Sequence, residues 1–155
     1  MSNPHKYNLT AKWTGNTGSG TLNPRAYSRN HSIFIENKAE ILASSDPIYR
    51  GDKTRHNPEE LLLAALSSCH MLSYLFVCAT NGVVVMEYID HATGLMTETA
   101  DGGGHFTEVT LNPIVTVTEA SMIEKANALH KEASALCIIA RSVNFPVHHN
   151  SSAHI

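Results

Sequence analysis

The hydrophobic and polar positions of this chain divide it into β-rich segments around two helices. The strongest pattern begins at Asn57 and ends at Gly82, and reads NPEELLLAALSSCHMLSYLFVCATNG. Asn57 is a good N-cap, Pro58 suits the first helical position, and Gly82 can adopt the left-handed conformation that ends many helices. The segment has no lysine or arginine, and apolar side chains occur on nearly every face. This pattern predicts a long, buried central helix.

The segments before this helix alternate between apolar and polar positions. The alternation from Tyr7 to Trp13 predicts a half-buried strand, and shorter strands are expected at Ser32 to Glu36 and at Glu40 to Ala43. Residues 44–56, SSDPIYRGDKTRH, are polar and basic. We expect them to form a loop that brings cations close to the central helix.

The segments after the helix predict a hairpin, a second helix and a short closing strand. Residues 83–97 and 105–117 are rich in valine, isoleucine and threonine, and a glycine-rich turn at 101–104 joins them into a long hairpin. Thr118 can cap an amphipathic helix whose inward stripe includes Cys137. A last strand is expected at 144–147, followed by a frayed tail. This order predicts a single α+β domain over residues 1–155, with helices packed on antiparallel sheet.

Composition and charge exclude several classes of partner. The chain has 43% hydrophobic and 16% charged residues and a net charge of −3, so it has no basic surface for nucleic acid or anionic membrane. The low charge favours an oligomer. The N-terminus lacks the pattern of a signal peptide, and serines and a histidine interrupt the apolar helix, so we expect no membrane span. The three cysteines predict a reducing, cytoplasmic location.

Cys69, in the middle of the central helix, is the main candidate for chemistry. A thiol reacts as a thiolate, and burial opposes its ionisation, so Cys69 needs a cation. An arginine held by a carboxylate is best suited, with candidates in the loop and at the start of the helix. The basic candidates are His70, Arg50, Lys53 and Arg55, and the carboxylates are Glu59 and Glu60. Taken alone, a buried cysteine is more often a packing residue than a catalytic one.

The spacing of Glu59 and Cys69 favours a dimer. They are ten residues apart, which is roughly 15 Å along a helix, so their side chains cannot touch within one subunit. Either a long arginine spans part of this gap, or a second copy of the helix packs antiparallel and brings its own Glu59 near the first Cys69. The second arrangement also explains why the helix is apolar on every face.

Cys137 is the natural partner for Cys69. A peroxide oxidises a thiolate to sulfenic acid, which condenses with a second thiol to a disulfide. Cys78 lies about 13 Å further along the central helix, so we expect it to be inert core. The ten histidines lack the spaced pairs of a zinc site, and Gly102 to Gly104 is a hairpin turn, so no metal or phosphate site is expected.

The motif NPEELLLAALSSCH, with Glu59 ten positions before Cys69, resembles the helix signature of the OsmC/Ohr family of osmotically inducible and organic hydroperoxide resistance proteins. An arginine-bearing loop precedes it, a glycine-turned β segment follows, and Cys137 comes 68 residues after Cys69. The longer stretch RGDKTRHNPEELLLAALSSCHMLSYL is similar to an OsmC-like subgroup. The family often has proline after the second cysteine, where this chain has Ile138.

This resemblance implies an intertwined homodimer with active sites at the subunit interface, and a thiol-dependent peroxidase that reduces organic hydroperoxides. It implies that Cys69 is the peroxidatic cysteine, Cys137 the resolving cysteine, and Glu59 the carboxylate that orients Arg50. Arg55 or Arg25 could serve in place of Arg50. No metal or prosthetic group is implied; an external dithiol of the lipoyl type would reopen the disulfide.

Two other functions remain open at this point. One is a non-catalytic protein that binds an apolar ligand in the dimer groove. The other is a Cys-His acyl-transfer enzyme that uses Cys69 with His70 or His56. Adjacent helical residues point about 100° apart, which weakens the pair of Cys69 and His70.

Overall fold

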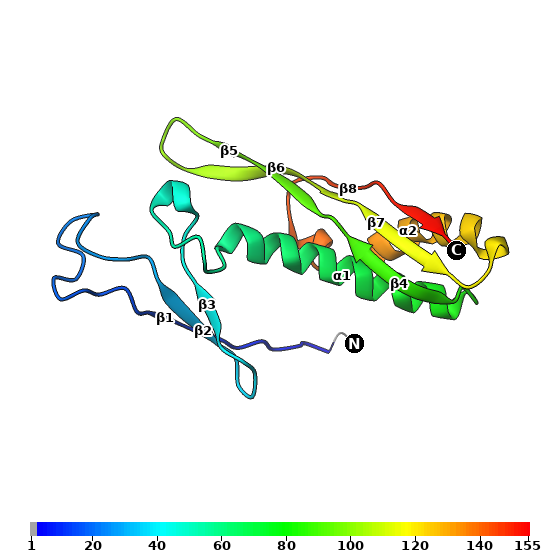
Figure 1. Ribbon diagram of the computed structural model, residues 1–155, viewed down its shortest axis with the longest axis horizontal. Coiled ribbons are helices and arrows are strands. Elements are labelled where there is room, and N and C mark those ends of the chain that lie inside the picture. Colours follow the sequence, from blue (N-terminus) through cyan, green and yellow to red (C-terminus); the bar gives the residue numbers. More distant parts are fainter. Residues whose placement is uncertain (1–2) are drawn as a thin grey trace. The chain divides into compact units, whose positions relative to one another are not determined.

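A computed structural model describes residues 3–155 (Figure 1). Its contacts divide the chain into two compact units, one ending at Leu61 and the other beginning at Leu62. Two helices and several sheets make the fold α+β, as the sequence predicts.

The first unit contains a three-stranded antiparallel sheet of β1 (Thr10–Trp13), β2 (His31–Phe34) and β3 (Ile41–Ala43), with β2 in the centre. The strands occur where the sequence predicts them but are shorter. All four residues of β1 are exposed, so the prediction of a half-buried strand is wrong for the single chain. Many of the unit's large apolar side chains are exposed, namely Tyr7, Leu9, Trp13, Leu22, Phe34, Leu42, Ile48 and Tyr49.

The central helix α1 covers Pro58–Thr80, and both of its ends are those predicted. The side chain of Asn57 accepts a hydrogen bond from the Glu60 amide at 2.8 Å, and the Glu60 carboxylate accepts one from the Asn57 amide at 3.2 Å, a reciprocal N-terminal cap. Gly82 follows the helix with a φ of 73°.

Burial of α1 is limited to one face in the single chain. Its buried residues are Leu66, His70, Tyr74, Val77 and Cys78. Leu72 and Phe76, one turn apart, are 64% and 63% exposed. The prediction that the helix is buried on all sides is therefore wrong for one copy of the chain. By length and composition α1 could cross a membrane, but core helices of soluble proteins meet the same criterion.

The second unit is built on one long hairpin (Figure 1). Its outer half pairs β5 (Thr93–Glu98) with β6 (Gly104–Leu111), and its inner half pairs β4 (Val85–Asp90) with β7 (Pro113–Val117), both antiparallel. The glycine-rich turn lies at the tip, where Gly102 has a φ of 84°. The predicted hairpin is present.

The C-terminal residues add a third strand to each half of the hairpin. β8 (Val147–His149) pairs with β6, β9 (Ser152–His154) pairs with β7, and both pairings are parallel. The prediction of a frayed tail is therefore wrong, and the sheets are mixed and not purely antiparallel. The tail is ordered because its backbone completes the hydrogen bonding at the edges of β6 and β7.

The second helix is shorter than predicted. A 3-10 turn at Ala120–Met122 precedes α2 (Ile123–Leu136), and a second such turn follows at Ala140–Ser142. Cys137 has an extended conformation and lies just past the end of α2. It is buried, as expected of the inward stripe, but it is not a helical residue.

The main core of this unit lies between the two helices and the inner sheet. Tyr74 and Val77 of α1 pack with Ala126 and Ala133 of α2 and with Val115 of β7. A second cluster contains Leu66, Val109 and Leu111. These two clusters fix α1 and α2 relative to the sheet.

Candidate functional site

The structure brings the thiols of Cys69 and Cys137 together. Cys69 lies in the middle of α1 and is half-buried, whereas Cys137 follows α2 and is 1% exposed. The two side chains are in hydrogen-bond contact, and both cysteines are free thiols. Two elements that are far apart in sequence therefore place two sulfur atoms where a disulfide could form.

The surroundings of Cys137 keep its thiol protonated. Burial raises its pKa to about 11, and the hydrogen bond to the Cys69 side chain acts in the same direction. A backbone amide, that of Ala140, donates to the Cys137 sulfur at 3.4 Å. Cys137 is therefore a weakly acidic thiol in contact with a more accessible one.

Cys78 belongs to the main core, as predicted. It is 1% exposed, and burial raises the pKa of its thiol. Its neighbours are the apolar residues of α1, α2 and the inner sheet. This thiol is therefore inert packing.

The basic loop before α1 holds arginines in different environments. Arg50 is exposed and has a φ of 66°, at the end of the 3-10 turn Pro47–Tyr49. Arg25 is also exposed. Arg55 is half-buried, its Nε lies 3.7 Å from Asp52, and its Nη1 is buried without a hydrogen-bond partner among the described residues.

Glu59 resembles Arg55 in having an unsatisfied polar atom. Its Oε2 is buried and has no hydrogen-bond partner within residues 3–155. No hydrogen bond or ion pair joins Glu59 to Arg50 or Arg55 in the described part of the chain. A buried guanidinium nitrogen and a buried carboxylate oxygen, both unpaired, indicate that the first unit lacks part of its polar complement.

The ring of His70 is engaged with other histidines and not with Cys69. Both ring nitrogens of His70 are occupied, Nδ1 by His149 at 3.1 Å and Nε2 by His130 at 3.0 Å. His56 lies in the first unit, where its Nδ1 is 4.0 Å from Glu60. The structure therefore gives no support to the pairing of Cys69 with His70.

The three linked histidines are the feature that the sequence did not reveal. They are His70 of α1, His130 of α2 and His149 of β8, and none of them is close to another in sequence. No spacing rule connects positions 70, 130 and 149. Among the described residues, no group of three or more histidine, cysteine or acidic side chains is arranged to hold a metal ion.

Comparison with known proteins decides the family. The model of the family described as OsmC-like protein matches residues 51–152, which is more than half of the chain. The chain belongs to the OsmC-like family. Among curated proteins, none matches.

Solved structures agree with the OsmC-like assignment. An OsmC-like protein of unknown function from Vibrio cholerae is 29% identical, with a TM-score of 0.85 over 96% of this chain and 99% of that one. An organic hydroperoxide resistance protein from Elizabethkingia anophelis is 16% identical, with a TM-score of 0.69 over 99% and 98% of the two chains. The organic hydroperoxide resistance protein OsmC from Legionella pneumophila is 14% identical, with a TM-score of 0.69 over 99% and 100%. The last two likenesses concern the fold.

Proposed function

We propose that this OsmC-like protein is a thiol-dependent peroxidase that reduces organic hydroperoxides to alcohols. The observation that carries the proposal is the contact between the thiols of Cys69 and Cys137. Structural neighbours that are named organic hydroperoxide resistance proteins support it at the level of the family. The protein would act in oxidative stress defence in the cytoplasm.

The reaction begins at Cys69. Its thiolate attacks the terminal oxygen of the hydroperoxide, the O–O bond breaks, and the alkoxide takes up a proton and leaves as the alcohol. Cys69 is oxidised to sulfenic acid and the peroxide is reduced. Cys69 is suited to this role because it is the more accessible of the two thiols.

Cys137 completes the oxidation. Its sulfur attacks the sulfenic acid, the Cys69–Cys137 disulfide forms, and hydroxide leaves as water with the proton from Cys137. A raised pKa suits this role, because Cys137 then stays a thiol until the sulfenic acid is present. An external dithiol, which we propose to be of the lipoyl type, reduces the disulfide by two electrons and becomes a disulfide itself.

An arginine from the loop before α1, held by Glu59, would stabilise the thiolate. Arg50 is the residue that the family pattern indicates, and Arg55 is the alternative. The burial of Arg55 and its unpaired Nη1 favour Arg55, since a desolvated guanidinium requires an anion. We propose that a second copy of the chain completes this site in a homodimer.

The proposal is tested by mass spectrometry after adding one equivalent of cumene hydroperoxide to the reduced protein. We expect a Cys69–Cys137 crosslink in the wild type and a dimedone-trapped sulfenic acid on Cys69 in Cys137→Ser. Cys78→Ser is the matched control, because its buried thiol takes no part, and it should form the crosslink like the wild type. Three thiols that remain reduced would instead favour a non-catalytic protein that binds an apolar ligand.

The arginine is identified by the rate of sulfenic acid formation in Cys137→Ser. Adding Arg55→Lys or Arg50→Lys keeps the charge but removes the two-pronged hydrogen bonding of the guanidinium. We expect the rate to fall at least tenfold for one of them only. Arg25→Lys serves as a further comparison.

A further inference from the structure

His149, His70 and His130 form one hydrogen-bonded row in the second unit. Nε2 of His149 lies 3.1 Å from Nδ1 of His70, and Nε2 of His70 lies 3.0 Å from Nδ1 of His130. His70 and His130 are 1% and 4% exposed, and the ring of Tyr74 stacks on that of His130 at 3.9 Å. We call these three residues the histidine row.

The hydrogens of the histidine row must point in one common direction. A neutral imidazole carries one hydrogen and can donate from only one nitrogen. If His149 donates to His70, then His70 donates to His130, and Nε2 of His130 carries a hydrogen. In the reverse order His130 donates to His70, and Nε2 of His130 is a bare acceptor. The state of this nitrogen therefore reports the order of the whole row.

Nε2 of His130 lacks a partner. It is buried and makes no hydrogen bond to any described residue. Leaving a buried polar group unpaired costs free energy, so a molecule that supplies the missing partner recovers that cost on binding. Nε2 of His130, at the end of the histidine row, is therefore available to hydrogen-bond a ligand.

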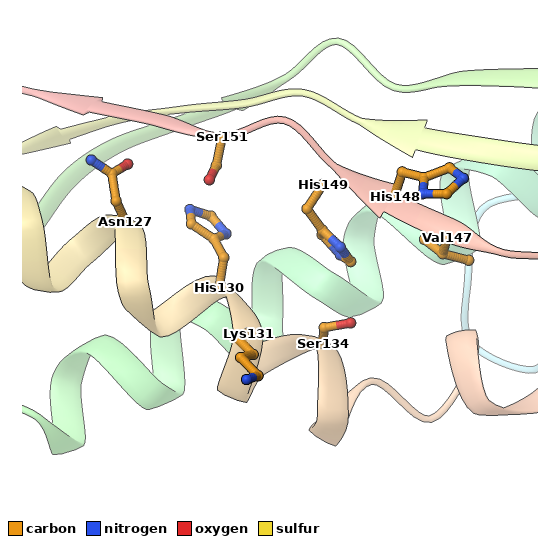
Figure 2. A pocket seen from close by; sticks show the side chains of 8 residues that line it. All are labelled: Asn127, His130, Lys131, Ser134, Val147, His148, His149 and Ser151. Atoms are coloured by element: carbon orange, nitrogen blue, oxygen red, sulfur yellow. The ribbon is translucent and has the colours of Figure 1, made fainter.

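A pocket of about 450 Å³ lies at this end (Figure 2). In Figure 2 the ring of His130 points up from α2 toward Ser151, between Asn127 and His149. Lys131 is the only lysine, arginine or acidic residue among those that line the pocket. The nearby carboxylate of Glu108 lies 3.7 Å from His148, at the rim. Asp90, from β4, is the carboxylate near His149. The two carboxylates thus lie at the His148 and His149 side of the pocket, and Lys131 supplies the positive charge of the lining itself.

We infer that this pocket binds a small molecule bearing an oxyanion group, a carboxylate or a phosphate, through Nε2 of His130. The flexible side chain of Lys131, whose ammonium group points away from the His130 ring in Figure 2, turns toward the bound anion. An anion accepts but does not donate, so it selects the order in which Nε2 of His130 carries the hydrogen. His70 then donates from Nε2 and His149 donates from Nε2, leaving Nδ1 of His149 bare. Binding at one end of the histidine row therefore fixes the tautomers of all three rings.

This site is separate from the proposed peroxidase chemistry. The two ring nitrogens of His70 are used within the histidine row and not toward Cys69. The inference therefore holds whether or not the thiols react with peroxides. Its test does not involve turnover.

The test is nitrogen NMR of the full chain labelled with ¹⁵N-histidine, at constant pH, with EDTA present to remove metals. The protein is titrated with inorganic phosphate or with succinate, and with chloride at matched ionic strength. We expect a saturable change in which Nε2 of His130 becomes protonated and Nδ1 of His149 becomes bare. A response to only one of the two anions identifies the source of the oxyanion.

Matched variants on α2 separate the site from a general charge effect. Lys131→Gln should weaken the oxyanion's apparent affinity roughly tenfold, the effect of losing one charged hydrogen bond. Lys125→Gln removes the same charge from α2 outside the pocket, where Lys125 donates to the carbonyl of Asn81, and should leave the affinity unchanged. The inference is overturned if neither anion gives a saturable change, if chloride gives the same change, or if both variants respond alike.

Discussion

At the scale of single residues, His70 and His130 give the protein a titration that its stability should report. Burial, together with the neighbouring histidines of the row, lowers the pKa of His70 to about 3 and that of His130 to about 4, from the usual 6.5. Tyr74 stacks on both rings, and Asp90 is the carboxylate near His149. The folded protein therefore keeps both rings neutral in a range where the unfolded chain takes up protons.

We expect the free energy of unfolding to decrease as the pH falls from 6.5 to 5. In that window the unfolded state binds more protons than the folded state, so stability rises with pH. Each of the two rings lowers the free energy of unfolding by about 2 kcal/mol at pH 5, relative to pH values above 6.5. Urea denaturation at several pH values measures this slope. His130→Gln should reduce it, whereas the exposed His105→Gln should not. A wild-type stability that is flat across this window would contradict the burial of the row.

Single residues also show what spacing can and cannot predict. The assignment of Cys69, Cys137, Arg50 and Glu59 to the site remains a prediction, derived from one helix motif and the position of a second cysteine. The histidine row could not be predicted, because its members approach one another only when α1, α2 and β8 pack together. Histidine patterns reveal a site in sequence only when its members repeat on one element.

At the scale of elements, the start of α1 depends on its reciprocal cap. Asn57→Ala removes the side-chain acceptor for the Glu60 amide and should destabilise the protein by about 1 kcal/mol. Chemical denaturation measures the change. Asn144→Ala, at an exposed asparagine, is the matched control and should stay within about 0.5 kcal/mol of the wild type. Equal effects of the two substitutions would contradict a role for the cap.

The elements that were predicted well are those whose signals are local. The cap residues and glycine of α1, and the glycine turn between β5 and β6, act through their own neighbours in sequence. The tail was predicted wrongly because β8 and β9 are defined by edges of β6 and β7, which are distant in sequence. The apolar spacing predicts that Cys137 lies in the second helix, but this spacing does not indicate where the helix ends, which is at Leu136.

At the scale of the whole molecule, the exposed apolar face of α1 agrees with the proposed homodimer. Leu72 and Phe76 are largely exposed in one chain, and the sheet of the first unit also exposes much of its apolar surface. Large exposed apolar patches are uncommon in monomers and often mark interaction sites. A second copy of this chain is the proposed occupant.

Phe76→Glu should convert the dimer to a monomer, because a carboxylate would be placed in an apolar interface. Size-exclusion chromatography with light scattering measures the mass. Ile155→Glu makes the same change at an exposed apolar residue at the C-terminus and should leave the dimer intact. A monomeric wild type, or equal masses for wild type and Phe76→Glu, would count against an interface on this face.

The sequence by itself determined the family-type helix, its cap, the hairpin and the two cysteines to consider, because each of these is a local pattern or a fixed spacing along one element. Only the tertiary structure decided that the side chains of Cys137 and Cys69 meet and that three histidines share hydrogen bonds. These contacts join residues far apart in the chain, and the packing of α1, α2 and the sheet places them together. Periodicity describes which face of an element is apolar, but not which partner will cover it.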